Sequence, residues 1–257
     1  MPPATVSVSS PSRATLPSLS PRRYAMPAPL TTNATSLNGT ANATGARIAA
    51  IVLAAGRSRR MAGVNKLLIP VAGQPMVVRA AAAALDSRAR PVLIVVGHQA
   101  DRVRTALRLL VDRDVDGPGQ VSRLAIIDNP SHGEGIAGSI RAGLDALPSG
   151  VDGAVFLLAD MPWISAGHVD RLIDAFDPAA GQSICVATYQ GRRGNPVLWG
   201  AAHFPALRTL DGDAGGRVLL AGLADQVKAV AFADPGVVTD VDRPGDLPSR
   251  ILPPRPD

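Results

Sequence analysis

An apolar run passes directly into an arginine-rich loop at Ile48-Ala49-Ala50-Ile51-Val52-Leu53-Ala54-Ala55-Gly56-Arg57-Ser58-Arg59-Arg60-Met61, and Asn65-Lys66 follow shortly after. The run from Ile48 to Leu53 predicts a buried strand. Glycine and alanine leave backbone N–H groups exposed in the loop, and fixed cations stand beside them, which suits phosphate binding. The alternative is an ordinary strand-to-helix turn with solvated arginines.

Lysine is scarce in this chain, which makes Lys66 conspicuous. Of the 26 Lys and Arg residues only two are lysines, Lys66 and Lys228. We interpret Lys66 as a compact, mobile point charge beside the loop. A standard P-loop needs Gly, four residues and then Gly-Lys-Ser/Thr. The loop does not fit that motif, because six residues separate Gly56 from Gly63 and Val64-Asn65 precede Lys66.

Apolar runs alternate with helix-like segments along most of the 257 residues, of which 46% are hydrophobic. This alternation predicts one α/β domain, Rossmann-like and three-layered, with a mostly parallel sheet. Residues 183–189 and 196–199 look like paired strands, separated by the loop 190–195, in an insertion that covers one side of the site. Further strands are predicted at 48–53, 91–96, 124–127, 154–158 and 227–232, and helices at 75–85, 100–111, 136–147 and 169–176.

The ends of the chain differ from this pattern. Residues 1–46 are rich in Ser, Thr, Pro, Ala and Asn and contain no Asp or Glu, so we expect a disordered tail. They contain no apolar h-region of a secretory signal peptide. The predicted α/β domain therefore spans 47–250, and residues 251–257 form a short C-terminal tail.

Charge and composition limit the possible partners. The formal net charge is +5, and Arg13, Arg22 and Arg23 of the tail account for three of these charges. Because aromatic residues make up only 3% of the chain, no nucleic-acid footprint is expected. No apolar run approaches the length of a membrane span, so we expect no membrane partner and a cytoplasmic location. A modestly basic body suits small anionic substrates, and Cys185, in an apolar run, is expected to be a buried thiol.

A carboxylate follows the strand predicted at 154–158, in Ala159-Asp160-Met161-Pro162. The carboxyl ends of parallel strands are where α/β folds bind their ligands. At this position Asp160 could hold Mg²⁺ against a triphosphate. It could equally cap a helix that begins near Ser165.

A second glycine pattern lies in Asn129-Pro130-Ser131-His132-Gly133-Glu134-Gly135-Ile136-Ala137-Gly138-Ser139. Gly133, Gly135 and Gly138 fit the dinucleotide-binding fingerprint, which would make the protein an NAD-dependent oxidoreductase. The fingerprint normally belongs to the first strand–helix unit, whereas this segment belongs to the third. The match stays open on the residues alone.

The loop resembles the molybdenum cofactor nucleotidyltransferase family, whose pattern is Leu-Ala-(Ala/Gly)-Gly-x-Ser-x-Arg-Met-Gly followed by a lysine. Leu53 to Arg60, Met61 and Lys66 match it, with Ala62 in place of the last glycine. The segment around Asp160 is similar to the family's Gly-Asp-Met-Pro. Thr239-Asp240-Val241-Asp242-Arg243-Pro244-Gly245-Asp246-Leu247 is similar to its Asp-Ile-Asp-Thr-Pro-Glu-Asp-Leu. The resemblance covers essentially all of residues 51–247.

The resemblance implies that the loop from Ala55 to Arg60, together with Lys66, holds a triphosphate. It implies Mg²⁺ or Mn²⁺ on Asp160 and Asp242, with Asp240 as the second choice, and catalytic roles for Lys66, Arg60 and Asp160. The implied nucleotide-binding residues are Leu53, Ala54, Ala55, Gly56, Ser58, Arg59, Lys66, Asn129, Gly135 and Ser139. Segments 191–197 and 212–217 are similar to those that face the second substrate, which implies roles for Arg192, Arg193, Asn195, Asp213 and Arg217.

The reaction that this resemblance implies joins CTP to the terminal phosphate of a molybdopterin-type cofactor and releases pyrophosphate. Ala55 resembles the CTP-using branch and Met161 the other, so a GTP-using molybdenum cofactor guanylyltransferase is an alternative. A sugar- or polyol-phosphate nucleotidyltransferase is another. From other classes, an NAD-dependent oxidoreductase and a non-catalytic cofactor-insertion chaperone stay open. The implied protein partner is a molybdenum hydroxylase or dehydrogenase, or its chaperone.

Overall fold

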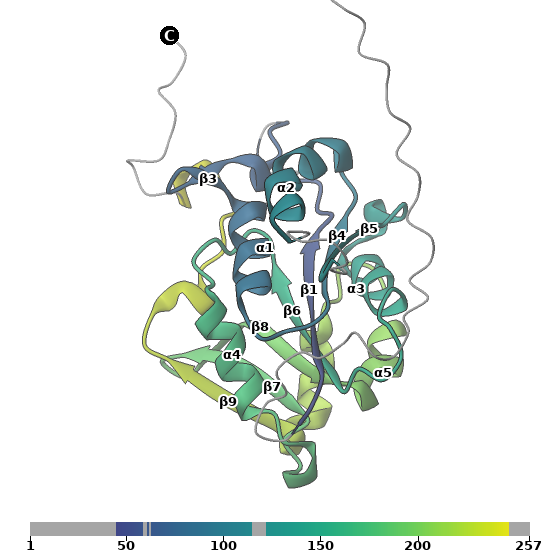
Figure 1. The fold of residues 1–257 in the computed structure, drawn as a ribbon. Helices are drawn as coiled ribbons and strands as arrows, with labels where there is room; N and C mark the ends of the chain where they lie inside the picture. The colour runs from purple at the N-terminus through teal and green to yellow at the C-terminus, as the bar shows by residue number, and fades with distance from the viewer. Residues whose placement is uncertain (1–44, 59–60, 62, 115–121, 247–257) are drawn as a thin grey trace, which may run out of the picture. The chain divides into compact units, whose positions relative to one another are not determined.

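The computed structural model describes residues 45–58, 61, 63–114 and 122–246 (Figure 1). The tails expected at 1–46 and 251–257 lie almost wholly outside these residues, as do Arg59 and Arg60 of the loop. At the start of the described domain, the backbone N–H of Arg47 donates to Oδ2 of Asp152 at 2.7 Å. The chain is therefore held in the domain from Arg47 onward.

The centre of the domain is a seven-stranded sheet in the order β5-β4-β1-β6-β8-β7-β9. Neighbouring strands pair in parallel except at β8, which runs antiparallel to both β6 and β7. The mostly parallel sheet that the sequence predicts is confirmed. Its strands are β1 (Ile48–Ala54), β4 (Val92–Val96), β5 (Leu124–Asp128), β6 (Gly153–Leu158), β7 (Ile184–Tyr189), β8 (Arg192–Gly200) and β9 (Val227–Phe232), and β2 (Pro70–Val71) and β3 (Gln74–Pro75) form a separate ribbon.

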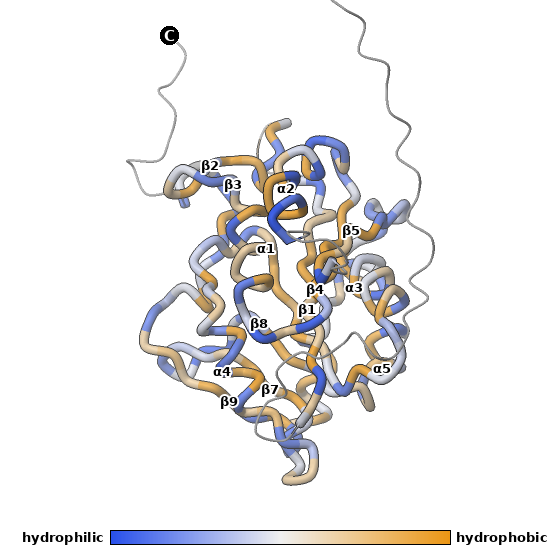
Figure 2. Tube along the Cα trace, in the orientation of Figure 1, coloured by the Kyte–Doolittle hydropathy of each residue, from blue (hydrophilic) through white to orange (hydrophobic). Residues whose placement is uncertain are grey.

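Helices cover both faces of the sheet and make it the middle of three layers (Figure 1). In β1, Ala50 and Val52 face one helical layer, and Ala49 and Ile51 face the other. Figure 2 shows hydrophobic residues concentrated along the central strands, as a sheet buried on both sides requires. One layer contains α1 (Met76–Asp86), α2 (Ala100–Asp114) and α4 (Ala166–Ala175), and the other contains α3 (Ile136–Asp145), α5 (Phe204–Arg208) and the 3₁₀ segment η5 (Gly216–Gln226).

The prediction that strands 183–189 and 196–199 belong to an insertion covering the site is wrong. β7 and β8 are integral to the main sheet, and β8 begins at Arg192 rather than after a six-residue loop. Gln190 and Gly191 have φ angles of +48° and +76°. This backbone makes a two-residue hairpin turn that matches strand twist, so pairing resumes at once, with Tyr189 opposite Arg192.

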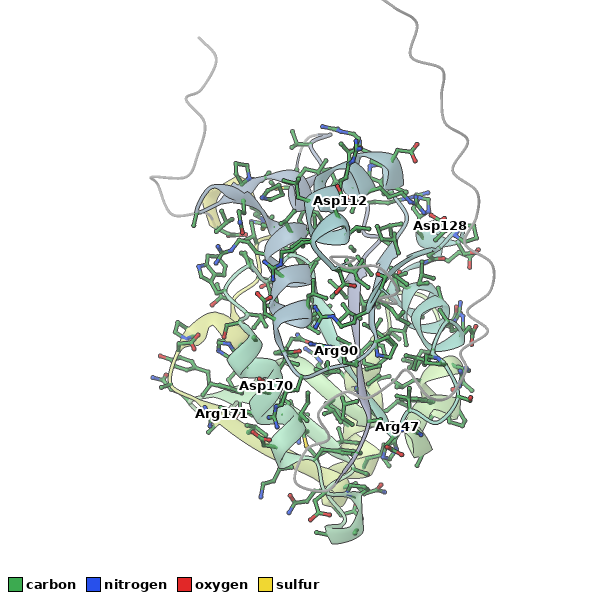
Figure 3. All side chains as sticks on the ribbon, viewed as in Figure 1. Arg47, Arg90, Asp112, Asp128, Asp170 and Arg171 are labelled. Carbon is green, nitrogen blue, oxygen red and sulfur yellow. The ribbon has the colours of Figure 1, made fainter. Side chains whose placement is uncertain are left out.

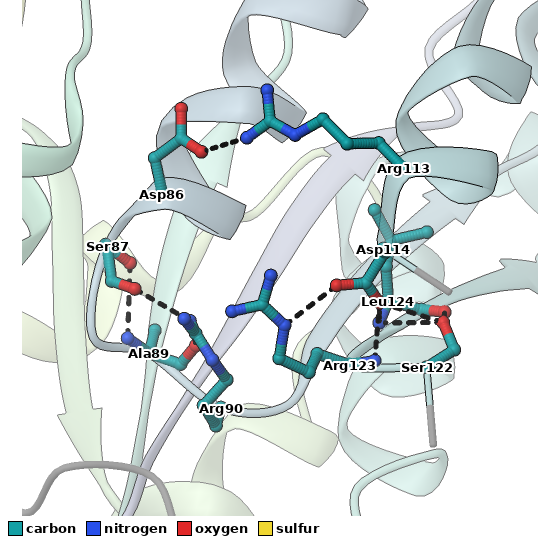
Figure 4. Close-up of polar contacts among 9 residues, drawn as sticks. All are labelled: Asp86, Ser87, Ala89, Arg90, Arg113, Asp114, Ser122, Arg123 and Leu124. Carbon is teal, nitrogen blue, oxygen red and sulfur yellow. Dashed lines mark hydrogen bonds and ion pairs between the residues drawn. The ribbon is translucent and has the colours of Figure 1, made fainter. Parts of the chain in front are cut away.

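A buried carboxylate fastens the end of α2 to β5 (Figure 4). Asp114 accepts hydrogen bonds from Nε of Arg123 at 2.8 Å, from Oγ of Ser122 at 3.0 Å and from the backbone N–H of Leu124 at 3.0 Å. Burial alone would raise the pKa of Asp114, but these hydrogen bonds outweigh it and the pKa lies below its ordinary value. The contact anchors β5, which is an edge strand of the sheet.

Two further expectations concern the Cys185 thiol and membrane-spanning helices. Cys185 is fully buried, as predicted, and its thiol pKa is raised by burial to about 12. Among the described helices, none combines the length and the hydropathy that a membrane span requires.

The order of the strands creates a crevice between β1 and β6. From β1 the chain crosses through α1 to β4 on one side, and from β5 it crosses through α3 to β6 on the other side. The connections therefore diverge beyond the carboxyl ends of β1 and β6. Open α/β sheets bind their ligands at such a switch point.

Candidate active site

A pocket of about 540 Å³ fills this crevice. Its walls come from the loop after β1, the turn that opens α3, the end of β6 and two loops from later in the chain. The volume lies within the range typical of small-molecule sites. Of the residues expected in the site, it is lined by Leu53, Ala55, Gly56, Ser58, Lys66, Gly135, Ser139, Asp160, Asp213 and Asp242.

Local hydrogen bonds fold the loop back on itself and fix the backbone of Lys66. Ser58 has a left-handed backbone, with φ at +51°, and its Oγ accepts from the N–H of Lys66 at 3.1 Å. Asn65 caps the short 3₁₀ helix Lys66–Leu68, because its Oδ1 accepts from the N–H of Leu67 at 3.1 Å. Lys66 thus starts a hydrogen-bonded turn that lines the pocket.

The Lys66 ammonium joins two carboxylates that are far apart in sequence. Nζ donates to Oδ2 of Asp160 at 2.7 Å and to Oδ1 of Asp242 at 2.7 Å. Burial alone would lower the pKa of Lys66, but the charge of Asp160 and the hydrogen bonds to both carboxylates outweigh it, so the pKa is raised above 10.5. The amine is therefore protonated and positively charged at neutral pH.

Backbone hydrogen bonds bring the two carboxylate segments together. The N–H of Ala159 donates to the carbonyl of Leu53 at 3.1 Å, which sets Asp160 beside the end of β1. The N–H of Val241 donates to the carbonyl of Asp160 at 3.0 Å. Oδ2 of Asp246 accepts from the N–H of Asp242 at 2.8 Å and closes the turn that presents its side chain.

A contact between His168 and Asp234 connects the segment that follows Asp160 with the segment that precedes Asp242. Nδ1 of His168 accepts from the N–H of Ser165 at 3.1 Å, and Nε2 lies 2.9 Å from Oδ2 of Asp234. The cap of α4 is therefore built from Ser165 and His168, and the alternative role of Asp160 as a helix cap is excluded. On the same helix, Arg171 donates to the carbonyl of Ala231 at 2.8 Å and so ties α4 to β9 (Figure 3).

The turn before α3 forms the opposite wall of the pocket. Gly135 has φ at +104°, and a Cβ there would lie 2.2 Å from the backbone of Gly212, so no other residue fits. Asn129 is buried outside the pocket lining and donates from Nδ2 to Oγ of Ser139 at 3.1 Å. This hydrogen bond orients the Ser139 hydroxyl.

The dinucleotide fingerprint lacks its structural context. The segment follows β5, which lies at the edge of the sheet and not beside the β1–β6 switch point. A Cβ at Gly138 would make only ordinary contacts, the nearest atom being Nδ2 of Asn129 at 3.5 Å. The third glycine of a true fingerprint is required for close packing of helix on strand, so this match has no such basis.

Several residues expected in the site are not among those that line this pocket. Ala54 is buried in β1, and Asp240 is exposed and outside the pocket lining. Asn195 also lies outside the lining, but the register of Phe156 opposite Val197 places it alongside the end of β6. Arg192, Arg193 and Arg217 are exposed and do not line the pocket either, and Arg59 and Arg60 fall outside the described residues.

The pocket also contains residues that the sequence did not single out. His132 and Glu134 line it from the turn before α3. Glu134 is the only glutamate in the sequence, and this rarity is the one sequence feature that could have pointed to it as a pocket residue. Arg57 lies against Gly133, where a Cβ would approach its guanidinium to 2.7 Å.

The carboxylate pair fits a hard divalent cation. Within the described part of the chain, Oδ1 of Asp160 is buried and has no hydrogen-bond partner. No group of three or more His, Cys, Asp or Glu side chains gathers as a metal cage among those same residues. Mg²⁺ commonly takes one or two carboxylates and completes its shell with phosphate oxygens and water. Asp160 and Asp242 meet that requirement.

Comparison with known proteins identifies the family. Residues 50–229 match the MobA-like NTP transferase domain. The chain belongs to this family. The matching model is that of an NTP transferase domain, so both the resemblance drawn from the sequence and the enzyme class are confirmed.

Individual relatives cover most of the chain. It is 32% identical to the purine catabolism protein PucB of Bacillus subtilis, over 76% of the chain and 91% of that protein. It is 29% identical to a nicotine blue oxidoreductase of Paenarthrobacter nicotinovorans, over 76% and 92%. It is 34% identical to a probable molybdenum cofactor guanylyltransferase of Haloferax mediterranei, over 52% and 57%. The crystal structure of Rv0371c from Mycobacterium tuberculosis superposes with a TM-score of 0.64 at 25% identity, over 78% and 95%.

Proposed function

We propose that this nucleotidyltransferase joins CTP to the terminal phosphate of a molybdopterin-type cofactor and releases pyrophosphate. The observation that carries the proposal is the convergence of Lys66, Asp160 and Asp242 at the β1–β6 crevice. A mobile cation, two carboxylates and a loop with exposed N–H groups are the parts that phosphoryl chemistry uses.

The reaction needs no protein nucleophile. An oxygen of the acceptor phosphate attacks the α-phosphorus of the triphosphate and forms the new P–O bond. The bond from that phosphorus to the oxygen bridging to the β-phosphate breaks, and the electron pair leaves with pyrophosphate. The protein contributes by aligning the two substrates and stabilising charge.

Different pocket residues bind the triphosphate, neutralise its charge, hold the metal and contact the nucleoside in this proposal. The loop from Ala55 to Ser58 receives the triphosphate, and Lys66 neutralises charge on the phosphate that leaves. Asp160 and Asp242 would hold Mg²⁺ or Mn²⁺. When bound, the metal supplies Lewis-acid stabilisation of the phosphate oxygens. Ser139 and Gly135 form the wall against which the nucleoside lies.

The second substrate lies on the β8 side in this proposal. Asp213 lines the pocket, and Asn195 stands beside the end of β6. Arg192, Arg193 and Arg217 are exposed cations, and they suit a long anionic acceptor that extends out of the pocket.

The choice of base rests on Ala55, which lines the pocket. Met161, whose resemblance favours GTP, is only 2% exposed and lies outside the lining, so it has no direct route to the base. The guanylyltransferase relative keeps GTP as the close competitor. A partner enzyme would be a molybdenum hydroxylase or dehydrogenase that receives the product.

A different candidate follows from the relative named nicotine blue oxidoreductase. If the protein were an oxidoreductase that uses a nicotinamide dinucleotide, NADH would bind the purified protein. A titration followed by NADH fluorescence, run beside CTP, separates the two activities.

The experiment that tests the proposal is a pyrophosphate-release screen. The full chain is incubated with each of the four NTPs and Mg²⁺, with and without purified molybdopterin. We expect release that depends on molybdopterin and is fastest with CTP. GTP as the preferred substrate would correct the base, and no release with any NTP would overturn the proposal.

A further inference from the structure

Lys66 occupies the space that a metal ion between the two carboxylates would need. Its Nζ lies 2.7 Å from one oxygen of Asp160 and 2.7 Å from one oxygen of Asp242. A single cation therefore already bridges both side chains. Mg²⁺ bound to these same two oxygens would sit at about 2.0–2.1 Å from each, where the ammonium in its present position would collide with it. At Oδ1 of Asp160, which is buried and has no partner among the described residues, the metal would instead lie beside the positive charge of the ammonium.

Charge balance gives the same conclusion. The ammonium already places a positive charge against both carboxylates. A divalent cation entering beside the ammonium would meet its positive charge in a site where the Lys66 side chain is only 12% exposed. Screening by water is weak at such positions. Metal binding is therefore favoured only once the ammonium has moved.

A triphosphate supplies the new partner for that ammonium. The backbone of Lys66 is fixed by Oγ of Ser58, and both residues line the same pocket as the loop at Gly56. The ammonium ends a flexible four-carbon chain. It can leave the carboxylates for a phosphate oxygen by side-chain rotation alone, with no movement of the fold.

We propose that Lys66 is an internal cation that keeps the Asp160–Asp242 pair closed to free divalent metal until a nucleoside triphosphate draws its ammonium away. This inference rests on the proposed function, because it assigns metal and triphosphate to this pocket. It predicts that neither free metal nor free triphosphate binds well alone. Since coupling between two ligands is reciprocal, each strengthens the other.

Coupling between metal binding and triphosphate binding would prevent unproductive metal complexes. A metal ion held without nucleotide would bind the acceptor phosphate or inorganic pyrophosphate at the same carboxylates. With Lys66 in place, the metal enters only together with the triphosphate that it serves. The order of binding is then set by one side chain.

The test is Mn²⁺ binding to the full chain without nucleotide, followed by the electron paramagnetic resonance signal of free Mn²⁺. We expect Lys66→Met to bind Mn²⁺ about tenfold more tightly than the unchanged protein, within the usual range of such couplings. Lys66→Gln, which keeps polar contacts to both carboxylates, should show the same gain and serves if the Met variant folds poorly. Lys228→Met, at the only other lysine in the sequence and an exposed position of β9, should leave the affinity unchanged.

Two further arms complete the test. Asp160→Asn in the Lys66→Met background should abolish the gain, which locates the metal. With a non-hydrolysable CTP analogue, the Mn²⁺ affinity of the unchanged protein should rise by a larger factor than that of Lys66→Met. Equal or weaker Mn²⁺ binding by both Lys66 variants would overturn the inference. Because the readout is metal binding, that failure is distinct from an absence of pyrophosphate release, which overturns the proposed function.

Discussion

The backbone N–H of Val241 donates to the carbonyl oxygen of Asp160 at 3.0 Å. This hydrogen bond aligns the C-terminal turn with the end of β6 and delivers Asp242 to the ammonium that Asp160 also binds. Asp240, on the other side of Val241, remains exposed. One backbone contact thus distinguishes between two carboxylates that the sequence alone leaves nearly equivalent.

Removing the Lys66 ammonium should cost the reaction one preorganised electrostatic contact. We expect Lys66→Ala to lower turnover in pyrophosphate release by about 10²-fold or more. Lys228→Ala is the matched control and should retain full activity. Unchanged kinetics in a folded Lys66→Ala protein would remove this residue from the chemistry.

The metal requirement should follow Asp160 and Asp242. We expect Asp160→Asn and Asp242→Asn each to raise the Mg²⁺ concentration for half-maximal rate by about tenfold or more, since each removes one of few protein ligands. Asp240→Asn should change it little. A Mg²⁺ titration of the rate measures the difference, and a larger effect at Asp240 would reverse the assignment.

The wall at Gly135 should tolerate no side chain. Gly135→Ala forces a Cβ onto Gly212 from a left-handed backbone, at a cost of about 1–3 kcal/mol. We expect lower thermal stability and a raised KM for the triphosphate. Gly138→Ala, three residues further along and inside α3, meets only ordinary contacts and is the matched control. Equal thermal stability and equal KM for the triphosphate in the two variants would contradict the claim that Gly135 must lack a side chain.

Asp114 should stabilise the fold in a pH-dependent way. Its pKa is lowered in the folded protein, so its contribution is present above its ordinary pKa and is lost as the pH falls through the lowered value. We expect Asp114→Asn to reduce the free energy of unfolding by about 1–3 kcal/mol at neutral pH. That difference should shrink in acid.

The control for this measurement is Asp112→Asn. Asp112 is exposed on the same helix, and among the described residues it pairs with Arg108, at 3.8 Å (Figure 3). Urea unfolding at pH 7 and near pH 3 compares the variants. A difference for Asp114→Asn that stays constant with pH would contradict the assignment of its charge.

The sequence predicts the elements whose pattern is local. The apolar runs predict β1, β4 and β6 to within a residue or two, because a strand buried on both faces must be apolar along its length. Asp160 is found for a related reason, since it comes directly after such a strand.

The sequence cannot predict what depends on a turn conformation or on contacts between distant segments. The strand pairing of residues 192–195 depends on left-handed backbone at Gln190 and Gly191, which a glycine-containing loop does not disclose. The position of Lys66 between two carboxylates depends on three segments that meet only in the fold. The pattern predicts an ammonium beside phosphate, whereas the ammonium lies on Asp160 and Asp242.

The central claim is nucleotidyl transfer at the Lys66–Asp160–Asp242 site, and phosphorus NMR of the reaction tests it most directly. The unchanged protein is mixed with CTP, Mg²⁺ and molybdopterin, beside Asp160→Asn as the inactive control. We predict that pyrophosphate and a new phosphate–phosphate linkage to the pterin appear in equal amounts, and that both signals are lost in the Asp160→Asn sample. CTP that stays intact with the unchanged protein, or that is hydrolysed to CMP without a pterin adduct, would contradict the account.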